Sequence, residues 1–287
     1  MKLFITGAKG QLGTDLLKEC AGRNIETFGV DIDEMDITDA ASVKSVMKEI
    51  YSRFPFDAVI HCAAHTAVDR AEDEPELVRS VNARGTQNIA DMCAELDVPM
   101  MYISTDYVFD GEGTEPWQPD DMNRHPLNVY GQMKYEGELA VESTLKKFFI
   151  VRISWVFGLH GKNFVSTMLR IGREKGKASV VSDQVGSPTY TPDLARLLVD
   201  MIRTDRYGRY HATNEGFCSW YEFAAEIFAQ AGLSVDLTPC DSGAFPVKAK
   251  RPHNSRMDKS KLDEAGFKRL PPWQDALRRY LEELKEG

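Results

Sequence analysis

The sequence predicts an α/β protein in which helices cover both faces of a parallel sheet. Three observations indicate this fold class. Short apolar runs alternate with helical patterns through the first half of the chain, a glycine-rich turn joins the first run to the first helical pattern, and 287 residues can bury one large core or two modest ones. Strands that alternate with helices of this length form crossover units, and crossover units give parallel sheets.

The first half of the chain alternates regularly between strand and helix. Strands are expected at the apolar runs 2–7, 25–31, 56–64, 98–105 and 148–158. Helices are expected where apolar residues recur at helical spacing, at 11–22, 39–54, 76–96 and around 128–138. We expect Gly22 to close the first of these helices and Thr38 to cap the second.

The order of elements becomes less regular after about residue 160. Helices are expected at 163–175, 193–203 and 219–231 and from about 273, strands at 178–182, 208–214 and 235–240, and loops at 183–192 and 248–258. We therefore expect one domain over 1–160 and a smaller mixed α/β domain over 161–287. Late elements often return to a sheet of this kind, so the boundary is a soft one.

Composition excludes several classes of function. The net charge is −9, and no run of lysine and arginine provides an electrostatic footprint for nucleic acid. No apolar run reaches the ~18 residues that cross a bilayer, and the chain enters its first strand with no signal peptide ahead of it. Five widely spaced cysteines are typical of reduced thiols. We expect a cytoplasmic protein with no membrane or nucleic-acid partner.

The segment "TGAKGQLG" predicts a phosphate-binding turn. It places Gly7, Gly10 and Gly13 between the first strand and the first helix. Glycines allow a tight turn and a close approach of backbone to ligand, and the N-terminus of a helix attracts a pyrophosphate. The spacing G-x-x-G-x-x-G differs from the more common G-x-G-x-x-G. Its position after a strand and before a helix still indicates a dinucleotide site, and hence a Rossmann-like, doubly wound sheet over residues 1–160.

An acidic turn follows the second strand. Asp31 lies 18 residues after Gly13, the offset at which an acid can bind the 2′-hydroxyl of the adenosine ribose. Asp33, Glu34 and Asp36 crowd the same turn, and residues 31–36 contain no lysine or arginine. A 2′-phosphate would meet negative charge there, so we expect a preference for NADH over NADPH. The alternative for Asp31 is a solvated strand end.

A third group of polar residues completes a pattern. Thr105 ends the expected fourth strand, next to Ser104, and Tyr130 and Lys134 stand four residues apart on the expected helix that follows. Ligands of open parallel sheets bind at the carboxyl ends of the strands. Taken alone, the tyrosine and lysine could be packing and a solvated charge. The order of glycine turn, hydroxyl and Tyr-x-x-x-Lys favours proton-handling residues of an enzyme.

With these motifs the chain resembles the extended short-chain dehydrogenases/reductases, and within them the reductases of dTDP-linked 4-keto-6-deoxyhexoses. The matching segments run from residue 5 to residue 258 and are "ITGAKGQLG", "HCAAHTAVDRAE", "YISTDYVFDG", "PLNVYGQMK", "VRISWVFG", "GKNFVSTML", "DQVGSPT" and "RPHNSRMD". The resemblance implies reduction of dTDP-6-deoxy-L-lyxo-4-hexulose with NADH or NADPH, in the supply of polysaccharide precursors.

The resemblance also implies roles for individual residues. Tyr130 would donate a proton to the C4 oxygen, Lys134 would bind the nicotinamide ribose and ease proton loss from Tyr130, and Thr105 would hydrogen-bond the substrate oxygen, a role that Ser104 could share. The cofactor would contact Gly7, Gly10, Gln11, Leu12, Gly13, Asp31, Asp36, Ile37, Ala63, Ala64, His65, Tyr130 and Lys134. The substrate would contact Thr105, Asp106, Trp155, Asn163, Gln184 and Arg251.

The sequence gives weaker evidence on metal binding and on oligomeric state. Some relatives resemble magnesium-bridged dimers that use surface acids, and Asp15 stands where one such acid falls. Thr191 and Pro192 stand where another acid is needed, so we expect no metal site. His61 and His65 are four apart, but His61 ends an apolar strand, so they need not share a face. The chain is expected to be a monomer or a homodimer.

Two other functions remain open from the sequence. The first is a related sugar-nucleotide reductase or epimerase that acts on a different base or sugar, because thymine and uracil differ by one methyl group, worth only ~1–3 kcal/mol in a pocket. The second is a catalytically silent regulatory homologue that keeps the fold and the cofactor. The presence of Thr105, Tyr130 and Lys134 favours a working enzyme.

Overall fold

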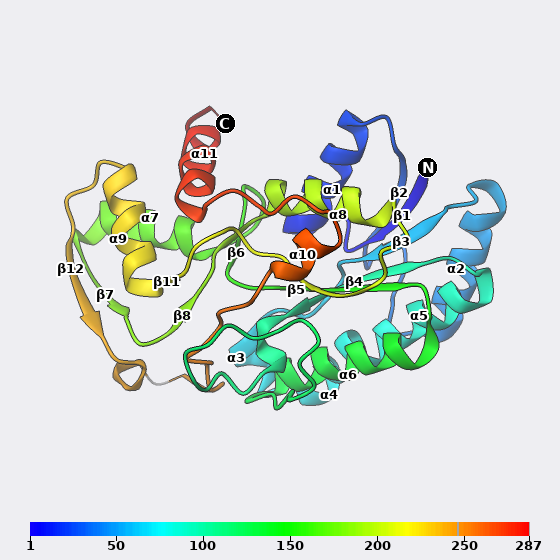
Figure 1. Cartoon of the computed structure of the whole chain (residues 1–287), viewed down its shortest axis with the longest axis horizontal. Coiled ribbons are helices and arrows are strands. Elements are labelled where there is room, and N and C mark those ends of the chain that lie inside the picture. The colour runs from blue at the N-terminus through cyan, green and yellow to red at the C-terminus, as the bar shows by residue number, and fades with distance from the viewer. Residues whose placement is uncertain (246, 287) are drawn as a thin grey trace.

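A six-stranded sheet forms the centre of the computed structural model, which describes residues 1–245 and 247–286 (Figure 1). All of its pairings are parallel, and the strand order is β10-β5-β4-β3-β1-β2. The strands are β1 Lys2–Thr6, β2 Glu26–Val30, β3 Ala58–His61, β4 Met100–Thr105, β5 Phe148–Ile153 and β10 Gly208–His211. The chain order reverses at β1, whose neighbours are β2 and β3, and this is the place where such sheets bind ligands.

Helices cover both faces of this sheet (Figure 1). One face carries α1 (Gln11–Gly22) and α8 (Thr191–Ile202), and the other carries α2 (Ala40–Arg53), α5 (Gly85–Leu96) and α6 (Val129–Thr144). Adjacent residues of β1 serve the two faces, because Leu3 packs with the first group and Phe4 with the second. The prediction of a doubly wound α/β fold is therefore confirmed.

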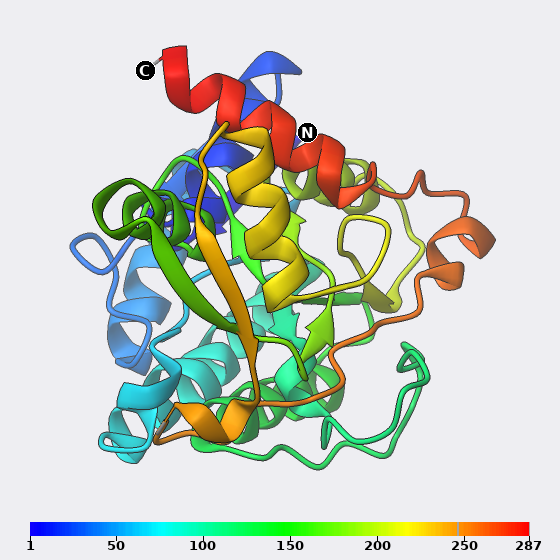
Figure 2. The same ribbon diagram turned by 90° about the vertical axis from the view of Figure 1, so that its left-hand side faces the viewer.

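A second lobe has its own core, against which α9 packs (Figure 2). Its helices are α7 (Phe164–Lys175), α9 (Trp220–Gln230) and α11 (Trp273–Glu286). β7 (Lys177–Val181) pairs in parallel with β12 (Asp236–Cys240). Two-residue strands link this lobe to the sheet: β6 (Val156–Phe157) pairs with β9 (Thr189–Tyr190), and β8 (Val185–Gly186) pairs with β11 (Cys218–Ser219).

Later elements return to the sheet. β10 extends it beside β5, and α8 packs on the same face as α1. Part of the region after residue 160 therefore belongs with the first lobe in space. Within the described residues, no helix is long and apolar enough to span a membrane.

Several local expectations were wrong. Asp39 rather than Thr38 caps α2, because its carboxylate accepts hydrogen bonds from the Ala41 and Ser42 amides at 2.9 and 3.3 Å. The expected end of the first helix is confirmed, because α1 ends at Gly22; Asn24 takes the left-handed turn that follows, with φ of 55°. The loop expected at 183–192 contains β8 and β9. The short helices α3 (Val68–Ala71) and α10 (Ser260–Glu264) were not expected.

The helix expected at 76–96 is three pieces. α4 (Pro75–Arg79) leads into a wide π-helical turn at Ser80–Arg84, and α5 follows it. Asn82 in this turn makes two hydrogen bonds with the backbone of His65, at 2.8 and 2.9 Å. π-turns are frequent at functional sites, and this one faces the segment after β3.

Buried charges attach α6 to the sheet. Glu138 of α6 is fully buried and accepts hydrogen bonds from Arg152 of β5 at 2.8 Å, from Arg124 at 3.0 Å and from the Ser104 hydroxyl of β4 at 2.6 Å. Burial opposes ionisation, but the two guanidinium groups hold the pKa of Glu138 below its ordinary value. The carboxylate therefore fixes the helix that carries Tyr130 and Lys134 against the ends of β4 and β5.

We expect Glu138→Gln to destabilise the protein by about 3–5 kcal/mol, because it leaves two buried guanidinium groups incompletely paired. Urea unfolding at neutral pH measures the change. Glu95→Gln is the control, since Glu95 forms exposed ion pairs with Lys44 and Lys48, and it should cost no more than about 1 kcal/mol. Equal effects of the two substitutions would contradict a stabilising role of the buried cluster.

Candidate active site

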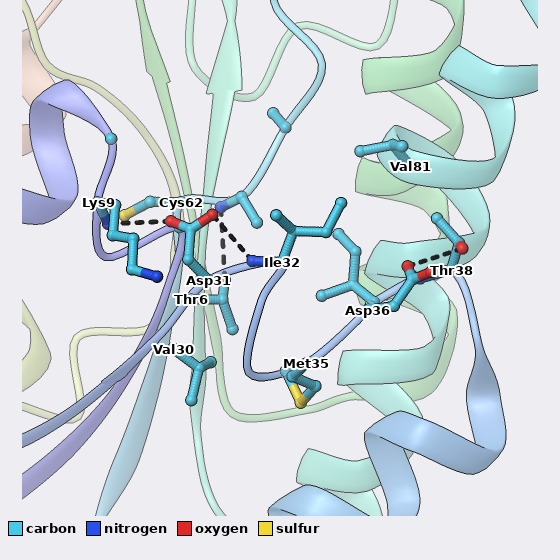
Figure 3. Close-up of a pocket in the computed structure, with 15 residues that line it drawn as sticks. Thr6, Lys9, Val30, Asp31, Ile32, Met35, Asp36, Thr38, Cys62 and Val81 are labelled. Atoms are coloured by element: carbon cyan, nitrogen blue, oxygen red, sulfur yellow. Dashed lines mark hydrogen bonds between the residues drawn. The ribbon is translucent and has the colours of Figure 1, made fainter. Parts of the chain in front are cut away.

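A groove at the carboxyl ends of the strands joins two pockets. The first, of about 420 Å³, lies beside the ends of β1 and β2 (Figure 3). The second, of about 470 Å³, lies beside the ends of β4 and β5 and reaches the second lobe. Both are lined by Gly7, Gly10, Cys62 and Ala64. The shared lining makes the pockets two halves of one elongated site.

The glycine turn at the middle of this groove has no room for side chains. Gly7 has a φ of +66°, and a Cβ there would lie 2.7 Å from the backbone nitrogen of Ala63. A Cβ at Gly13 would lie 2.2 Å from the carbonyl oxygen of Gly7. Gly10 is the N-cap of α1 and supplies no side-chain hydrogen bond to the first amides of the helix. These observations fit a dinucleotide whose pyrophosphate lies at the start of α1.

The first pocket fits the adenosine part of a dinucleotide. Asp31 lies at its edge, where its two oxygens accept hydrogen bonds from the amides of Lys9 and Ile32, both at 2.9 Å (Figure 3). The rest of this pocket is lined by apolar side chains and by residues predicted from the sequence to contact the cofactor. These residues include Val30, Met35, Asp36, Ile37, Ala63, Ala64 and Val81. Asp36 is held in place by the amide and hydroxyl of Thr38.

The second pocket brings Thr105, Tyr130 and Lys134 together. Asn128 caps α6 through the Gly131 amide, at 2.8 Å, and so fixes the helix start that carries Tyr130. The ring of Tyr107 packs edge-on against that of Tyr130. The sequence left open whether Ser104 shares the role of Thr105, and both residues line this pocket. The Ser104 hydroxyl donates to the buried Glu138 at 2.6 Å, and the Thr105 hydroxyl donates to Asp106 at 3.0 Å.

Burial dominates the acid–base properties of this pocket. It raises the pKa of Tyr130 well above the ordinary value, and a hydrogen bond with Thr105 only partly opposes this. Burial lowers the pKa of Lys134 to about 7, against the opposing charge of Glu138. The Lys134 ammonium donates to the carbonyl of Ile103 at 2.7 Å. Burial also raises the pKa of Asp106 to about 6, and one oxygen of that carboxylate has no hydrogen-bond partner among the described residues.

Two tryptophans form the wall on the side of the second lobe. Trp155 interrupts the strand expected at 148–158 and takes the left-handed conformation, with φ of 49°. Its ring stacks on that of Trp220, with centroids 3.7 Å apart. Gly186 also packs against Trp155, where a Cβ would lie 3.0 Å from the indole. Strained backbone of this kind persists where neighbouring packing holds it, and it is common at functional sites.

Four predicted contacts lie outside the linings of both pockets. Asn163 caps α7 and contacts Gln11 at 3.4 Å. Gln184 hydrogen-bonds Ser242, and Arg251 pairs with Asp69 at 2.7 Å. His65 is held through its backbone by Asn82. The remaining predicted residues, namely Gln11, Leu12, Gly13, Asp106 and Trp155, line the second pocket.

The structure adds site residues that the motifs did not indicate. Lys9 lies inside the glycine turn and lines the first pocket. Trp220, Lys162 and Tyr107 line the second pocket. Lys9 could have been found from its place between two of the glycines. Trp220 carries no such signal, because only the fold brings it to Trp155.

Comparison with known proteins assigns the chain to a family. The family model described as the RmlD substrate binding domain matches residues 1–286. The chain belongs to this family. It is similar to the dTDP-4-dehydrorhamnose reductase of Aggregatibacter actinomycetemcomitans, with 39% identity over 96% of this chain and 97% of the relative. The resemblance inferred from the motifs is confirmed.

Two solved structures are also similar over nearly the whole chain. The dTDP-4-dehydrorhamnose reductase of Clostridium acetobutylicum is 40% identical, covers 99% of this chain and 100% of its own, and superposes with a TM-score of 0.94. The enzyme of that name from Bacillus anthracis, solved in complex with NADP, is 41% identical over 98% of this chain and 99% of its own, with a TM-score of 0.94.

The lowered pKa of Lys134 predicts a pH-dependent cost of folding. Below pH 7 the buried amine is charged in both states and its desolvation penalty is complete. Between pH 7 and about 10.5 the unfolded chain holds a proton that the folded chain has lost, so the free energy of unfolding rises with pH by at most about 1.4 kcal/mol per unit.

We therefore expect the stability of Lys134→Met, relative to the unsubstituted protein, to be highest below pH 7 and to fall as the pH rises towards 10. Urea unfolding of both proteins at several pH values measures this difference. Lys44→Met, at a lysine whose side chain is 59% exposed, is the control. A constant difference between Lys134→Met and the unsubstituted protein across this interval would refute the expectation.

Proposed function

We propose that this chain reduces the 4-keto group of dTDP-6-deoxy-L-lyxo-4-hexulose to give dTDP-L-rhamnose, the reaction of a dTDP-4-dehydrorhamnose reductase. The observation that carries the proposal is the convergence of Thr105, Tyr130 and Lys134 in one pocket that continues into the glycine-lined groove. The relatives that cover nearly the whole chain bear the name of this enzyme.

The protein's own groups are suited to protonating a ketone. A bound reduced nicotinamide supplies a hydride, and the C4 oxygen gains negative charge as the hydride arrives. Tyr130 remains a protonated phenol at neutral pH because its pKa is raised by burial, so it is a proton donor rather than a base. The Tyr130 phenol is a hydrogen-bond donor held where that charge develops, and the Thr105 hydroxyl, which donates to Asp106 at 3.0 Å in this structure, would turn to the same oxygen.

In this proposal Lys134 binds the nicotinamide ribose and assists Tyr130. Its amine is buried beside the carbonyl of Ile103 and the ring of Tyr102, where burial lowers its pKa to about 7. A nicotinamide ribose that accepts hydrogen bonds from this amine would favour its charged form. The charge would then ease proton loss from Tyr130 during reduction.

The substrate sugar would occupy the second pocket. Asp106 offers an oxygen with no hydrogen-bond partner among the described residues, and the Trp155–Trp220 stack offers an apolar wall. Arg251 and Lys248 pair with Asp69 and Asp73 of the first lobe, so these cations must leave their carboxylates to contact a nucleotide diphosphate. Asn163 and Gln184 lie outside the linings of both pockets, so the second pocket must widen around the nucleotide for them to contact it. We further propose a cytoplasmic monomer or homodimer.

For the cofactor we propose a preference for NADH. Asp31 stands at the edge of the adenosine pocket with Asp33, Glu34 and Asp36 nearby, and a 2′-phosphate would be repelled there. The relative from Bacillus anthracis was solved with NADP. The proposed preference for NADH therefore rests on the acidic residues of this chain and not on the comparison.

The proposal is tested by following NADH and NADPH oxidation with a panel of nucleotide-linked 4-keto sugars. We expect the highest kcat/KM with the dTDP-linked 4-keto-6-deoxyhexose, and a higher kcat/KM with NADH than with NADPH. Preference for another base or sugar would indicate a related reductase or epimerase. Cofactor binding without oxidation of any cofactor would indicate a silent homologue.

In the same assay we expect Tyr130→Phe to lose most of the reductase activity, by about 10²–10⁴-fold, because general acid catalysis contributes that much. Binding of NADH, measured by calorimetry, should remain close to that of the unsubstituted protein. Tyr107→Phe is the matched control, since it removes a neighbouring hydroxyl from the same pocket. Near-normal turnover by Tyr130→Phe would end the mechanism.

A further inference from the structure

Trp220 brings an aromatic ring from the second lobe to the second pocket. It is the first residue of α9, and the cap of this helix fixes its backbone. The Ser219 hydroxyl accepts a hydrogen bond from the Glu222 amide at 3.1 Å, and the Glu222 carboxylate accepts one from the Ser219 amide at 2.7 Å. The Trp220 ring lies on that of Trp155, with centroids 3.7 Å apart and planes inclined by 15°. A residue at the end of the central sheet thus contacts the start of α9.

The main chain of Trp155 does not by itself place its indole. Trp155 lies between β5 and β6 with φ of 49°, a conformation that costs free energy in residues other than glycine. Hydrogen bonds with Thr189 hold this main chain, since the Trp155 carbonyl accepts from its amide at 3.1 Å and the Ser154 carbonyl accepts from its hydroxyl at 2.7 Å. These bonds leave the side-chain torsions of Trp155 free, so the position of the indole depends on packing.

The second lobe supplies that packing. Within the described part of the chain, Trp220 is the aromatic ring that stacks on Trp155. Trp220 is held in turn by Phe164 of α7, with ring centroids 4.5 Å apart. All three rings pack against the core of the second lobe. The indole of Trp155 is therefore oriented by the second lobe, although its main chain follows β5 of the central sheet.

Both indoles face the place proposed for the substrate sugar. They are half-buried, and they line the pocket that also contains Thr105 and Tyr130. An indole offers a large apolar surface on which the C–H groups of a hexose can pack. A wall that tilts would let the hexose shift relative to the Tyr130 phenol, and small displacements of a reacting group are costly.

We propose that Trp220 is a positioning residue of the substrate pocket, which through its stack on Trp155 holds that indole as the wall against which the hexose of a nucleotide-linked sugar packs. This role rests on the proposed function and adds the residue that maintains the affinity for the sugar half of the substrate. Trp155 touches the hexose, and Trp220 acts through Trp155. Loss of Trp220 therefore matters only while Trp155 is present.

The affinity gained from the hexose is the quantity to measure. It is the ratio of the dissociation constant of dTDP to that of dTDP-L-rhamnose, the proposed product. Calorimetry on the full chain with NADH present gives both constants, and NADH does not react with this product. Because dTDP carries the base and the diphosphate without a hexose, a general loosening of the second lobe would weaken both ligands and leave the ratio unchanged.

We expect Trp220→Leu to lower this ratio by about three- to tenfold, which is the range of one aromatic pair. Trp220→Phe keeps a ring for the stack and should stay within about twofold of the unsubstituted protein. Trp155→Ala should lower the ratio at least as far as Trp220→Leu. The double variant Trp155→Ala/Trp220→Leu should match Trp155→Ala within about twofold, because two residues that act through one contact are not additive.

Circular dichroism follows the stack itself. Two indoles in contact couple their electronic transitions and give paired far-ultraviolet bands of opposite sign. These bands should disappear in Trp220→Leu and in Trp155→Ala. Phe228→Leu is the matched control, because Phe228 is buried in the same core on the same helix and pairs with neither tryptophan among the described aromatic rings. It should destabilise the second lobe and leave both the bands and the ratio unchanged.

An unchanged ratio in Trp220→Leu would overturn the proposal, and so would an equal fall of the ratio in Phe228→Leu. Full additivity in the double variant would also overturn it, because Trp220 would then contact the hexose independently of Trp155. Failure of the unsubstituted protein to bind either dTDP or dTDP-L-rhamnose would instead refute the proposed function.

Discussion

The carboxylate of Glu138 is the group on which the geometry of the site depends. It is one of few acids in the described chain with no exposed surface, and it joins three elements that meet at the carboxyl edge of the sheet. Ser104 belongs to β4, Arg152 to β5, and Glu138 itself to the helix that carries Tyr130 two turns earlier. A buried ion pair is costly to form but holds its partners in one arrangement when every hydrogen bond is satisfied.

The Glu138 carboxylate also binds one of the two hydroxyls at the end of β4. The Ser104 hydroxyl donates to Glu138, whereas the Thr105 hydroxyl donates to Asp106, although both residues line the pocket. Lys134 lies one turn before Glu138 on the same helix, so the negative charge partly offsets the desolvation of the Lys134 amine. Glu138 thus positions the helix that carries the proposed catalytic residues and partly offsets the effect of burial on Lys134.

The two halves of the groove differ in their exposure to solvent and in what controls their charges. The adenosine half is exposed and acidic, and its contacts are backbone amides and weak ion pairs around Asp31. The other half is buried, with pKa values displaced by loss of solvent rather than by neighbouring charges. Binding specificity for the cofactor can therefore change by surface substitutions, whereas the proton donor depends on its buried surroundings, which include the edge-on ring of Tyr107.

Local sequence patterns predicted much of this arrangement, and long-range contacts were beyond them. The alternation of strands and helices in the first half, the glycine turn, and the tyrosine and lysine of α6 follow from local spacing, because each involves residues within a few turns of each other. The place of Lys9 inside the glycine turn is visible in the sequence, but its ion pairs with Asp33 and Glu34 were missed because these residues are more than 20 positions away and reach it through the parallel pairing of β1 with β2. Trp220 was missed for the same reason. A prediction of cofactor preference that counts charges only in residues 31–36 omits Lys9, which the pairing of β1 with β2 brings beside Asp33 and Glu34.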